Sequence, residues 1–152
     1  MKQKPVFYFF IALCIFALDQ ITKHTVKINV HRLDIIEVLP FFNIVYVENI
    51  GSAFGMFKSL GNIFFVIVAL SAIIIVSFLI IKDSRNRLGL SMILGGAAGN
   101  LMDRLIYGYV IDFLYIYIGK YHWPAFNIAD AALTAGIFIF FFESFFQDHK
   151  NK

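Results

Sequence analysis

Four apolar segments of about 20 residues each dominate this chain of 152 residues. A helix needs about 20 apolar residues to cross the hydrocarbon core of a bilayer, and the segments cover about 6–26, 62–81, 88–106 and 129–146. The whole chain is 60% hydrophobic and only 15% charged, which lies outside the usual range of soluble proteins. We therefore expect residues 1–152 to form a single integral membrane domain, with an all-α core of four transmembrane helices.

The first apolar segment also has features of a secretory signal peptide, because Lys2 and Lys4 precede it. No small-x-small cleavage site follows the segment, however, and the chain continues directly into Asp19, Gln20 and Lys23. We interpret it as a retained transmembrane helix.

Basic residues are concentrated where the predicted helices would face the cytoplasm. Lys2 and Lys4 precede the first span, three basic residues lie in the short loop 82–87, and Lys150 and Lys152 follow the fourth span. Short cytoplasmic loops are enriched in Lys and Arg. This pattern predicts that both termini are cytoplasmic and that the two longer connections lie outside.

Those two longer connections, about 30–58 and 108–127, are rich in β-branched and aromatic residues. The runs on either side of Pro40 predict a hairpin, and residues 109–117 resemble a third strand. Aromatic side chains such as Trp123 are typical of the membrane–water interface. We expect a small extracytoplasmic β platform resting on the membrane.

Polar side chains lie at the predicted outer ends of three spans. Because an ionisable group near lipid is costly, a chain that keeps several of them there is expected to use them. With alternating helix directions, these residues should converge at one level near the outer boundary of the membrane. They are Asp19, Lys23, Asn100, Asp103, Arg104 and Asp130.

Asp130 and Asp112, which lies in the predicted third strand, are the strongest candidates for catalysis. Two carboxylates in one site can remain one protonated and one ionised, so that one activates water and the other donates a proton. The alternative is structural: Asp130 would cap the fourth helix, and Asp112 would form a salt bridge at a strand end. Spacing alone leaves both interpretations open.

The other polar pairs have simpler interpretations. Asn100 and Arg104 share one helix face, and Arg104 could pair with Asp103 or hold a lipid or peptide carbonyl. Asp19 and Lys23, four residues apart, are typical of a stabilising ion pair within a helix.

The sequence gives little support for metal, cofactor or serine-based catalysis, or for nucleic acid binding. The four histidines have no paired spacing, and Cys14 is the single cysteine, so neither a metal site nor a cofactor is predicted. Ser52 with Lys23 or Lys58 is a minor alternative as a nucleophilic pair. The net charge of +3 forms no basic patch, so we expect no nucleic acid partner.

Four short motifs occur in the order found in a known family. The chain resembles the lipoprotein signal peptidases, or signal peptidases II, which are membrane aspartic peptidases of bacteria. One position departs mildly from the family pattern, since Ser52 stands where Ala is frequent. The motifs are Asp19-Gln20-x-Thr22-Lys23, Asn49-x-Gly51-x-Ala53-Phe54, Gly99-Asn100-x-x-Asp103-Arg104 with Val110-x-Asp112-Phe113, and Phe126-Asn127-x-Ala129-Asp130.

The resemblance implies that Asp112 and Asp130 form a catalytic dyad that uses an activated water and no cofactor. It implies prolipoprotein substrates that carry a diacylglyceryl group on a cysteine, cleavage just before that cysteine, and inhibition by globomycin. Membrane lipids are the other expected partners, in a monomeric enzyme of the bacterial cytoplasmic (inner) membrane whose active site faces outward. Residues implied in substrate binding or support are Asn49, Gly51, Asn100, Asp103, Arg104, Asn127, Asp19 and Lys23.

Two other classes of protein remain as alternatives. A small transporter could use intramembrane acids to carry protons or bind cations, but it should place an acid near the middle of the membrane. A structural membrane subunit would not bring two carboxylates together from separate elements. A short distance between the side chains of Asp112 and Asp130 would favour the peptidase.

Overall fold

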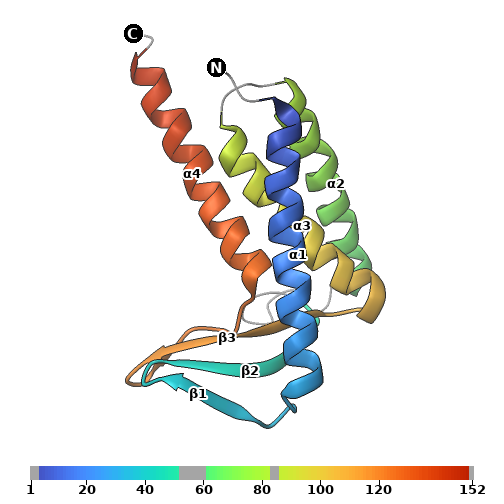
Figure 1. The fold of residues 1–152 in the computed structure, drawn as a ribbon, viewed down its shortest axis with the longest axis vertical. Helices are drawn as coiled ribbons and strands as arrows, with labels where there is room; N and C mark the ends of the chain where they lie inside the picture. The colour runs from blue at the N-terminus through green and yellow to red at the C-terminus, as the bar shows by residue number, and fades with distance from the viewer. Residues whose placement is uncertain (1–3, 52–60, 83–85, 151–152) are drawn as a thin grey trace.

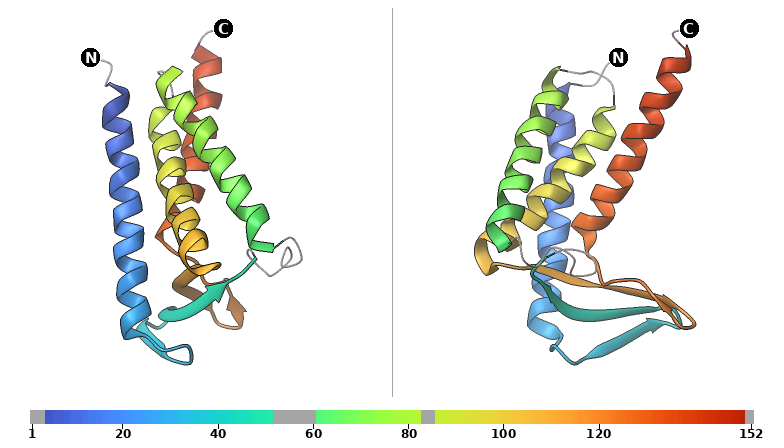
Figure 2. Two further views of the ribbon diagram at one scale, coloured as in Figure 1. Left: turned by 90° about the vertical axis from the view of Figure 1, so that its right-hand side faces the viewer. Right: turned by 180° about the vertical axis from the view of Figure 1, so that it is seen from behind.

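The computed structural model describes residues 4–51, 61–82 and 86–150. Its four helices run alongside one another, and a small β-sheet lies across one end of the bundle (Figure 1). The first helix begins and the fourth helix ends at the opposite end of the bundle, where the second helix also ends and the third begins (Figures 1 and 2). This arrangement matches the predicted combination of a helical core with a β platform at one end.

The helix bounds agree with the predicted segments to within a few residues. The helices are α1 (Pro5–Asn29), α2 (Gly61–Lys82), α3 (Arg87–Tyr107) and α4 (Ile128–Lys150). Within the described residues, α1, α2 and the Ile128–Phe146 part of α4 are long and apolar enough to span a membrane. The third predicted span, α3, does not reach that hydropathy because it carries glycines and polar side chains.

Helix α3 packs against each of the other three helices, and three of its polar residues, Ser91, Asn100 and Asp103, are buried. Gly95 and Gly99 permit the close approach of α1: a Cβ atom at Gly95 would lie 2.6 Å from the carbonyl oxygen of Ala12. A Cβ at Gly99 would lie 2.5 Å from Asp19 Oδ2. The two glycines therefore act as the small residues that tight helix packing in membranes requires.

The sheet is antiparallel and has the strand order β1-β2-β3-β4. The strands are β1 (Ile35–Leu39), β2 (Phe42–Asn49), β3 (Val110–Ile118) and β4 (Tyr121–His122). The predicted hairpin around Pro40 and the predicted strand at 109–117 are thus confirmed. The register of β2 and β3 shifts between Ile44 and Val47, and Val47 pairs with Asp112.

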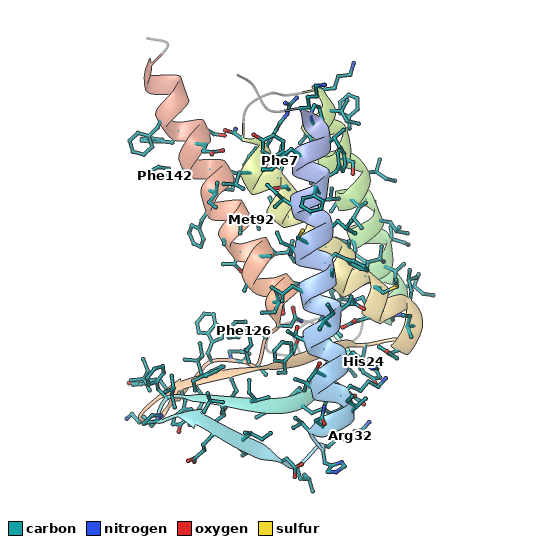
Figure 3. The ribbon with its side chains drawn as sticks, in the orientation of Figure 1. Phe7, His24, Arg32, Met92, Phe126 and Phe142 are labelled. Atoms are coloured by element: carbon teal, nitrogen blue, oxygen red, sulfur yellow. The ribbon has the colours of Figure 1, made fainter. Side chains whose placement is uncertain are left out.

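Two apolar clusters hold the helices to one another and to the sheet. The first lies between the helices and includes Ile80 and Leu94. The second joins the C-terminal end of α1 to the sheet, through Val26, Ile111 and Phe113. Figure 3 shows Arg32 and Phe126 at the sheet end of the molecule, and Phe7 and Phe142 toward the other end.

The segment before α4 returns to the sheet and determines where α4 begins. Phe126 forms a bridge with Leu114 of β3: the N–H of each residue donates to the carbonyl of the other. Asn127 follows immediately, so the first turn of α4 starts beside β3. This backbone connection brings Asp112 and Asp130 to the same part of the molecule.

Candidate active site

Asp112 is the third residue of β3 and is only 2% exposed. Its carboxylate accepts two side-chain amides, from Asn127 Nδ2 at 2.7 Å and from Asn49 Nδ2 at 2.9 Å. Burial and, second, the negative charge of Asp130 together raise the pKa of Asp112 from its usual 3.8 to about 7. The two amide donors oppose this shift because they favour the ionised carboxylate.

Asp130 lies in the first turn of α4, and its Oδ1 accepts a hydrogen bond from Asn100 Nδ2 at 2.7 Å. Asp130 is not the cap of that helix. The cap is Asn127, whose Oδ1 accepts the backbone N–H of Asp130 at 2.8 Å. The carboxylate of Asp130 is therefore not occupied in capping the helix that carries it.

Two asparagines connect the two aspartates. Asn127 Nδ2 donates to Asp112 and also lies 3.3 Å from Asn100 Oδ1, and Asn100 in turn donates to Asp130. Residues of β3, α3 and α4 thus form one hydrogen-bonded chain from carboxylate to carboxylate. In the described part of the protein, neither aspartate forms a salt bridge, so the structural alternative of a strand-end ion pair at Asp112 is wrong.

Lys23 lies beside this chain, almost fully buried. Its Nζ lies 2.8 Å from Asp19 Oδ2, 3.0 Å from Asp103 Oδ2 and 3.0 Å from Asn100 Oδ1. The predicted ion pair between Asp19 and Lys23 is confirmed, and it is part of a larger group that joins α1 to α3. The polar residues at the sheet end of the helices converge, as predicted.

Arg104 does not pair with Asp103, whose carboxylate is occupied by Lys23. One guanidinium nitrogen of Arg104 lies 3.3 Å from the carbonyl oxygen of Asn100, and the guanidinium stands 5.1 Å from the centre of the Phe65 ring. Asn62 of α2 donates to the Arg104 carbonyl at 3.1 Å. These contacts hold the end of α3 against the beginning of α2.

Asn49, the last residue of β2, forms a local turn while it binds Asp112. Its Oδ1 accepts the backbone N–H of Gly51 at 3.0 Å, which leaves Nδ2 directed at the carboxylate. Gly51 is buried beside it. Ser52 and Lys58, the minor alternative as a nucleophilic pair, lie outside the described residues.

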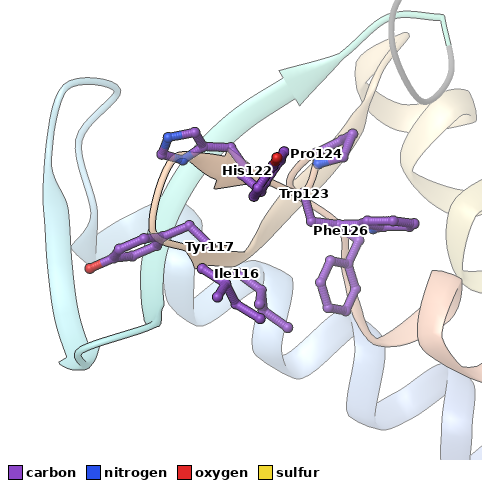
Figure 4. Close-up of a pocket in the computed structure, with 8 residues that line it drawn as sticks. Ile116, Tyr117, His122, Trp123, Pro124 and Phe126 are labelled. Atoms are coloured by element: carbon purple, nitrogen blue, oxygen red, sulfur yellow. The ribbon is translucent and has the colours of Figure 1, made fainter.

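One apolar hollow adjoins Asp130 along α4, and a second hollow continues from it. The first, of about 670 Å³, is lined by Asp130 and by Leu133, Thr134 and Phe138 along α4. The second, of about 530 Å³, lies at the β3–β4 hairpin (Figure 4). Three residues line both hollows, so the two are contiguous: Trp123, Pro124 and Phe126.

The sequence did not lead us to predict Gln20 as a residue of the site, although it contacts the polar group around Lys23. Its Nε2 lies 3.0 Å from Asp103 Oδ1, 3.2 Å from Asp19 Oδ2 and 3.2 Å from the carbonyl oxygen of Gly99. A polar amide next to Asp19 in an otherwise apolar segment was a signal that could have identified it. No group of three or more His, Cys, Asp or Glu side chains in residues 4–51, 61–82 and 86–150 is placed to hold a metal ion.

The sequence also matches known proteins over most of its length. The family model described as signal peptidase (SPase) II matches residues 11–146. A lipoprotein signal peptidase from Thermodesulfovibrio yellowstonii is 48% identical over 130 residues, covering 86% of this chain and 88% of the relative. Another, from Alteromonas mediterranea, is 39% identical over 151 residues, covering 95% of this chain and 83% of the relative.

Two solved structures have a closely similar fold. A bacterial membrane enzyme determined by the in meso method at 2.3 Å resolution superposes with a TM-score of 0.86 at 33% identity, covering 95% of this chain and 90% of that chain. A second, at 1.9 Å resolution, gives a TM-score of 0.83 at 32% identity, covering 93% and 96%. On the family match and these relatives, the chain belongs to the signal peptidase II family, the aspartic peptidases that remove signal peptides from prolipoproteins.

Proposed function

We propose that Asp112 and Asp130 are the catalytic dyad of this peptidase, and that it cleaves the peptide bond just before a diacylglyceryl-modified cysteine. The observation that carries the proposal is the hydrogen-bonded chain from Asp112 through Asn127 and Asn100 to Asp130. It brings two carboxylates from separate elements to one site, which a transporter or a structural subunit would not require. The family assignment favours the same conclusion.

The environment of Asp112 suggests how the two roles are divided. Since burial and the charge of Asp130 raise the pKa of Asp112 to about 7, we assign the proton at rest to Asp112. Asp130 then acts as the general base toward water, and Asp112 acts as the general acid toward the scissile carbonyl.

The reaction follows from these two roles. Asp130 takes a proton from water as the water oxygen attacks the scissile carbonyl carbon, and Asp112 gives its proton to the carbonyl oxygen. The resulting tetrahedral intermediate collapses when its C–N bond breaks: the proton on Asp130 passes to the leaving nitrogen, and Asp112 recovers a proton from the hydroxyl. The products are a signal peptide with a free carboxylate and a lipoprotein that begins with the modified cysteine.

The neighbouring polar residues position the substrate and the dyad. Asn49, Asn100 and Asn127 hold the two carboxylates through their side-chain amides. We assign Arg104 to a substrate carbonyl, because its guanidinium is positioned by Phe65 and by its own helix. Gly51 completes the site through the turn it forms with Asn49.

The two hollows supply a place for the apolar parts of the substrate. Asp130 lies at the edge of the larger hollow, and the rest of its lining along α4 is mainly apolar. We assign this surface to the signal peptide or the acyl chains as they approach from the bilayer. Since lipid holds acyl chains equally well, we expect this surface to position the cysteine more than to tighten binding.

The arrangement in the membrane follows the distribution of charge. We assign both termini to the cytoplasm, with four spanning helices and residues 1–152 as one domain of a monomeric enzyme. The sheet and the dyad then lie at the extracytoplasmic face, next to membrane lipids. Helix α3 crosses the membrane shielded by its neighbours, consistent with its packing against the other three helices.

The substrate assignment can be tested with purified protein in micelles. A prolipoprotein carrying diacylglyceryl on its cysteine should be cut directly before that cysteine, and an unmodified copy should remain intact. Mass spectrometry of both products identifies the bond. Equal cleavage of the unmodified copy, or cleavage at another bond, would contradict the proposal.

A further inference from the structure

Among the described residues, Lys23 is the one cation that contacts three side-chain oxygens beside the dyad. It is 1% exposed, and its ammonium contacts Asp19, Asp103 and Asn100 at 2.8–3.0 Å. Because three protein oxygens surround it, the ammonium cannot reach a substrate bound at the dyad. Any influence of Lys23 on the reaction must pass through these partners.

The two carboxylates that hold Lys23 also hold the backbone beside the dyad. Asp19 Oδ1 accepts the backbone N–H of Ala129 at 2.8 Å, and Ala129 directly precedes Asp130. Asp103 Oδ2 accepts the backbone N–H of Ile111 at 3.0 Å, and Ile111 directly precedes Asp112. Lys23 therefore joins two carboxylates that each fix the residue before one member of the dyad.

The third contact determines the orientation of the Asn100 amide. Lys23 carries only donors, so the atom of Asn100 that faces it must be the oxygen. The amide nitrogen then points to Asp130 Oδ1, 2.7 Å away. Without the ammonium, this orientation would depend on the longer 3.3 Å contact with Asn127.

We propose that Lys23 is a positioning residue for peptide-bond cleavage, acting on Asp130 through Asn100 and on the spacing of the dyad through Asp19 and Asp103. This inference rests on the proposed dyad. The proposed role differs from that of a purely structural ion pair, which can often be replaced by apolar residues without loss of stability. The contact with Asn100 gives Lys23 a role that such a replacement would not restore.

A double-mutant cycle on kcat tests this coupling. Lys23→Met should lower kcat by about tenfold or more with little change in KM, because Lys23 does not touch substrate. In an Asn100→Ala background the same substitution should lower kcat by about threefold or less. Lys27→Met, one turn further along α1 where the lysine lies over the ring of Tyr107, should leave kcat unchanged. Equal effects of Lys23→Met in both backgrounds would contradict the coupling.

A second variant separates folding from positioning. Lys23→Met leaves two buried carboxylates without their counter-ion, which is strongly destabilising. The triple variant Asp19→Asn/Lys23→Met/Asp103→Asn removes all three charges, and the new amide oxygens can still accept the N–H groups of Ala129 and Ile111. We expect it to recover the thermal stability of the wild type but not its kcat, and it can replace Lys23→Met in the cycle.

Each remaining outcome has a defined meaning. Wild-type kcat in the triple variant would overturn the inference, and failure of both variants to fold would assign Lys23 to the fold alone. Asp112→Asn, measured in parallel, tests the function on which the inference rests. If Asp112→Asn stays active, the dyad assignment fails; if it is inactive while the cycle is additive, only the role of Lys23 fails.

Discussion

Asn127 donates its side-chain amide to Asp112 at 2.7 Å, although Asp112 belongs to β3 and Asn127 immediately precedes α4. The carbonyl oxygen of the same side chain caps α4 through the N–H of Asp130. A single side chain thus fixes the start of the helix that carries one aspartate and binds the other aspartate directly. The geometry of the dyad depends on this residue.

The two roles of Asn127 can be separated by substitution. Asn127→Ser keeps a good N-cap but removes the amide donor, so stability should change little while activity falls strongly. Asn127→Ala removes both and should cost about 1 kcal/mol of stability in addition. Thermal unfolding and cleavage rates in micelles measure the two effects. Full activity of Asn127→Ser would show that the contact with Asp112 is dispensable.

The raised pKa of Asp112 predicts how activity depends on pH. Below about pH 7 the carboxyl of Asp112 keeps the proton that a general acid needs, and above that it loses it. The cleavage rate should therefore fall as the pH rises through about 7, although the two aspartates titrate as a pair. A pH profile of kcat without an alkaline limb between about pH 6 and 8 would contradict the assignment of the acid.

The same pKa predicts an effect on stability. The folded state binds the Asp112 proton more tightly than the unfolded chain, whose aspartates titrate near 4. The resulting stabilisation is fully present below about pH 4 and is lost as the pH rises through about 7. Asp112→Asn should lack this dependence, which thermal unfolding at several pH values can measure. An identical pH dependence in wild type and variant would contradict the raised pKa.

Much of the fold could be predicted from local patterns. Four apolar segments and the turn at Pro40 gave helix and strand positions to within a few residues, because hydrophobic periodicity and turn residues act locally. The hydrogen-bond partners within the site could not be predicted in the same way. Asp103 binds Lys23 of α1 and not its neighbour Arg104, since packing between helices decides which charges meet.

The N-cap of α4 is not the residue that the sequence pattern suggested. An Asp at a helix start suggested a cap, but Asn127 lies three residues before Asp130 and fills that role. An Asn followed three residues later by an acid is itself a helix-start signal. Gln20 could have been found because it is an amide inside an apolar segment, whereas its partners on α3 follow only from the packing.

Two glycines of α3 predict different consequences for the same substitution. A Cβ at Gly99 would fall against Asp19 Oδ2, so Gly99→Ala should disturb the Lys23 group and lower both stability and kcat. Gly95→Ala would collide with the backbone of Ala12, farther from the site, and should lower stability alone. The cleavage rate per folded molecule distinguishes the two variants, because only Gly99→Ala should lower it. Equal losses of kcat would contradict this account of Gly99.

The apolar hollows predict a residue that affects cleavage by positioning the substrate. Trp123 lines both hollows, so Trp123→Ala should lower kcat for a lipid-modified substrate more than it raises KM. Tyr121 lines only the hollow at the β3–β4 hairpin, so Tyr121→Ala measures the contribution of that hollow alone and should lower kcat less. If Trp123→Ala keeps the wild-type kcat, the hollow beside Asp130 does not position the substrate.

The proposed activity depends most on the dyad, and the kcat values of Asp112→Asn and Asp130→Asn test it most directly. The matched control is Asp34→Asn, the same change at an exposed turn residue at the sheet end of the molecule. Both dyad variants should insert and fold normally yet lose activity by about a hundredfold or more, while Asp34→Asn stays near wild type. Substantial cleavage by either folded dyad variant would contradict the assignment of Asp112 and Asp130 as the catalytic pair.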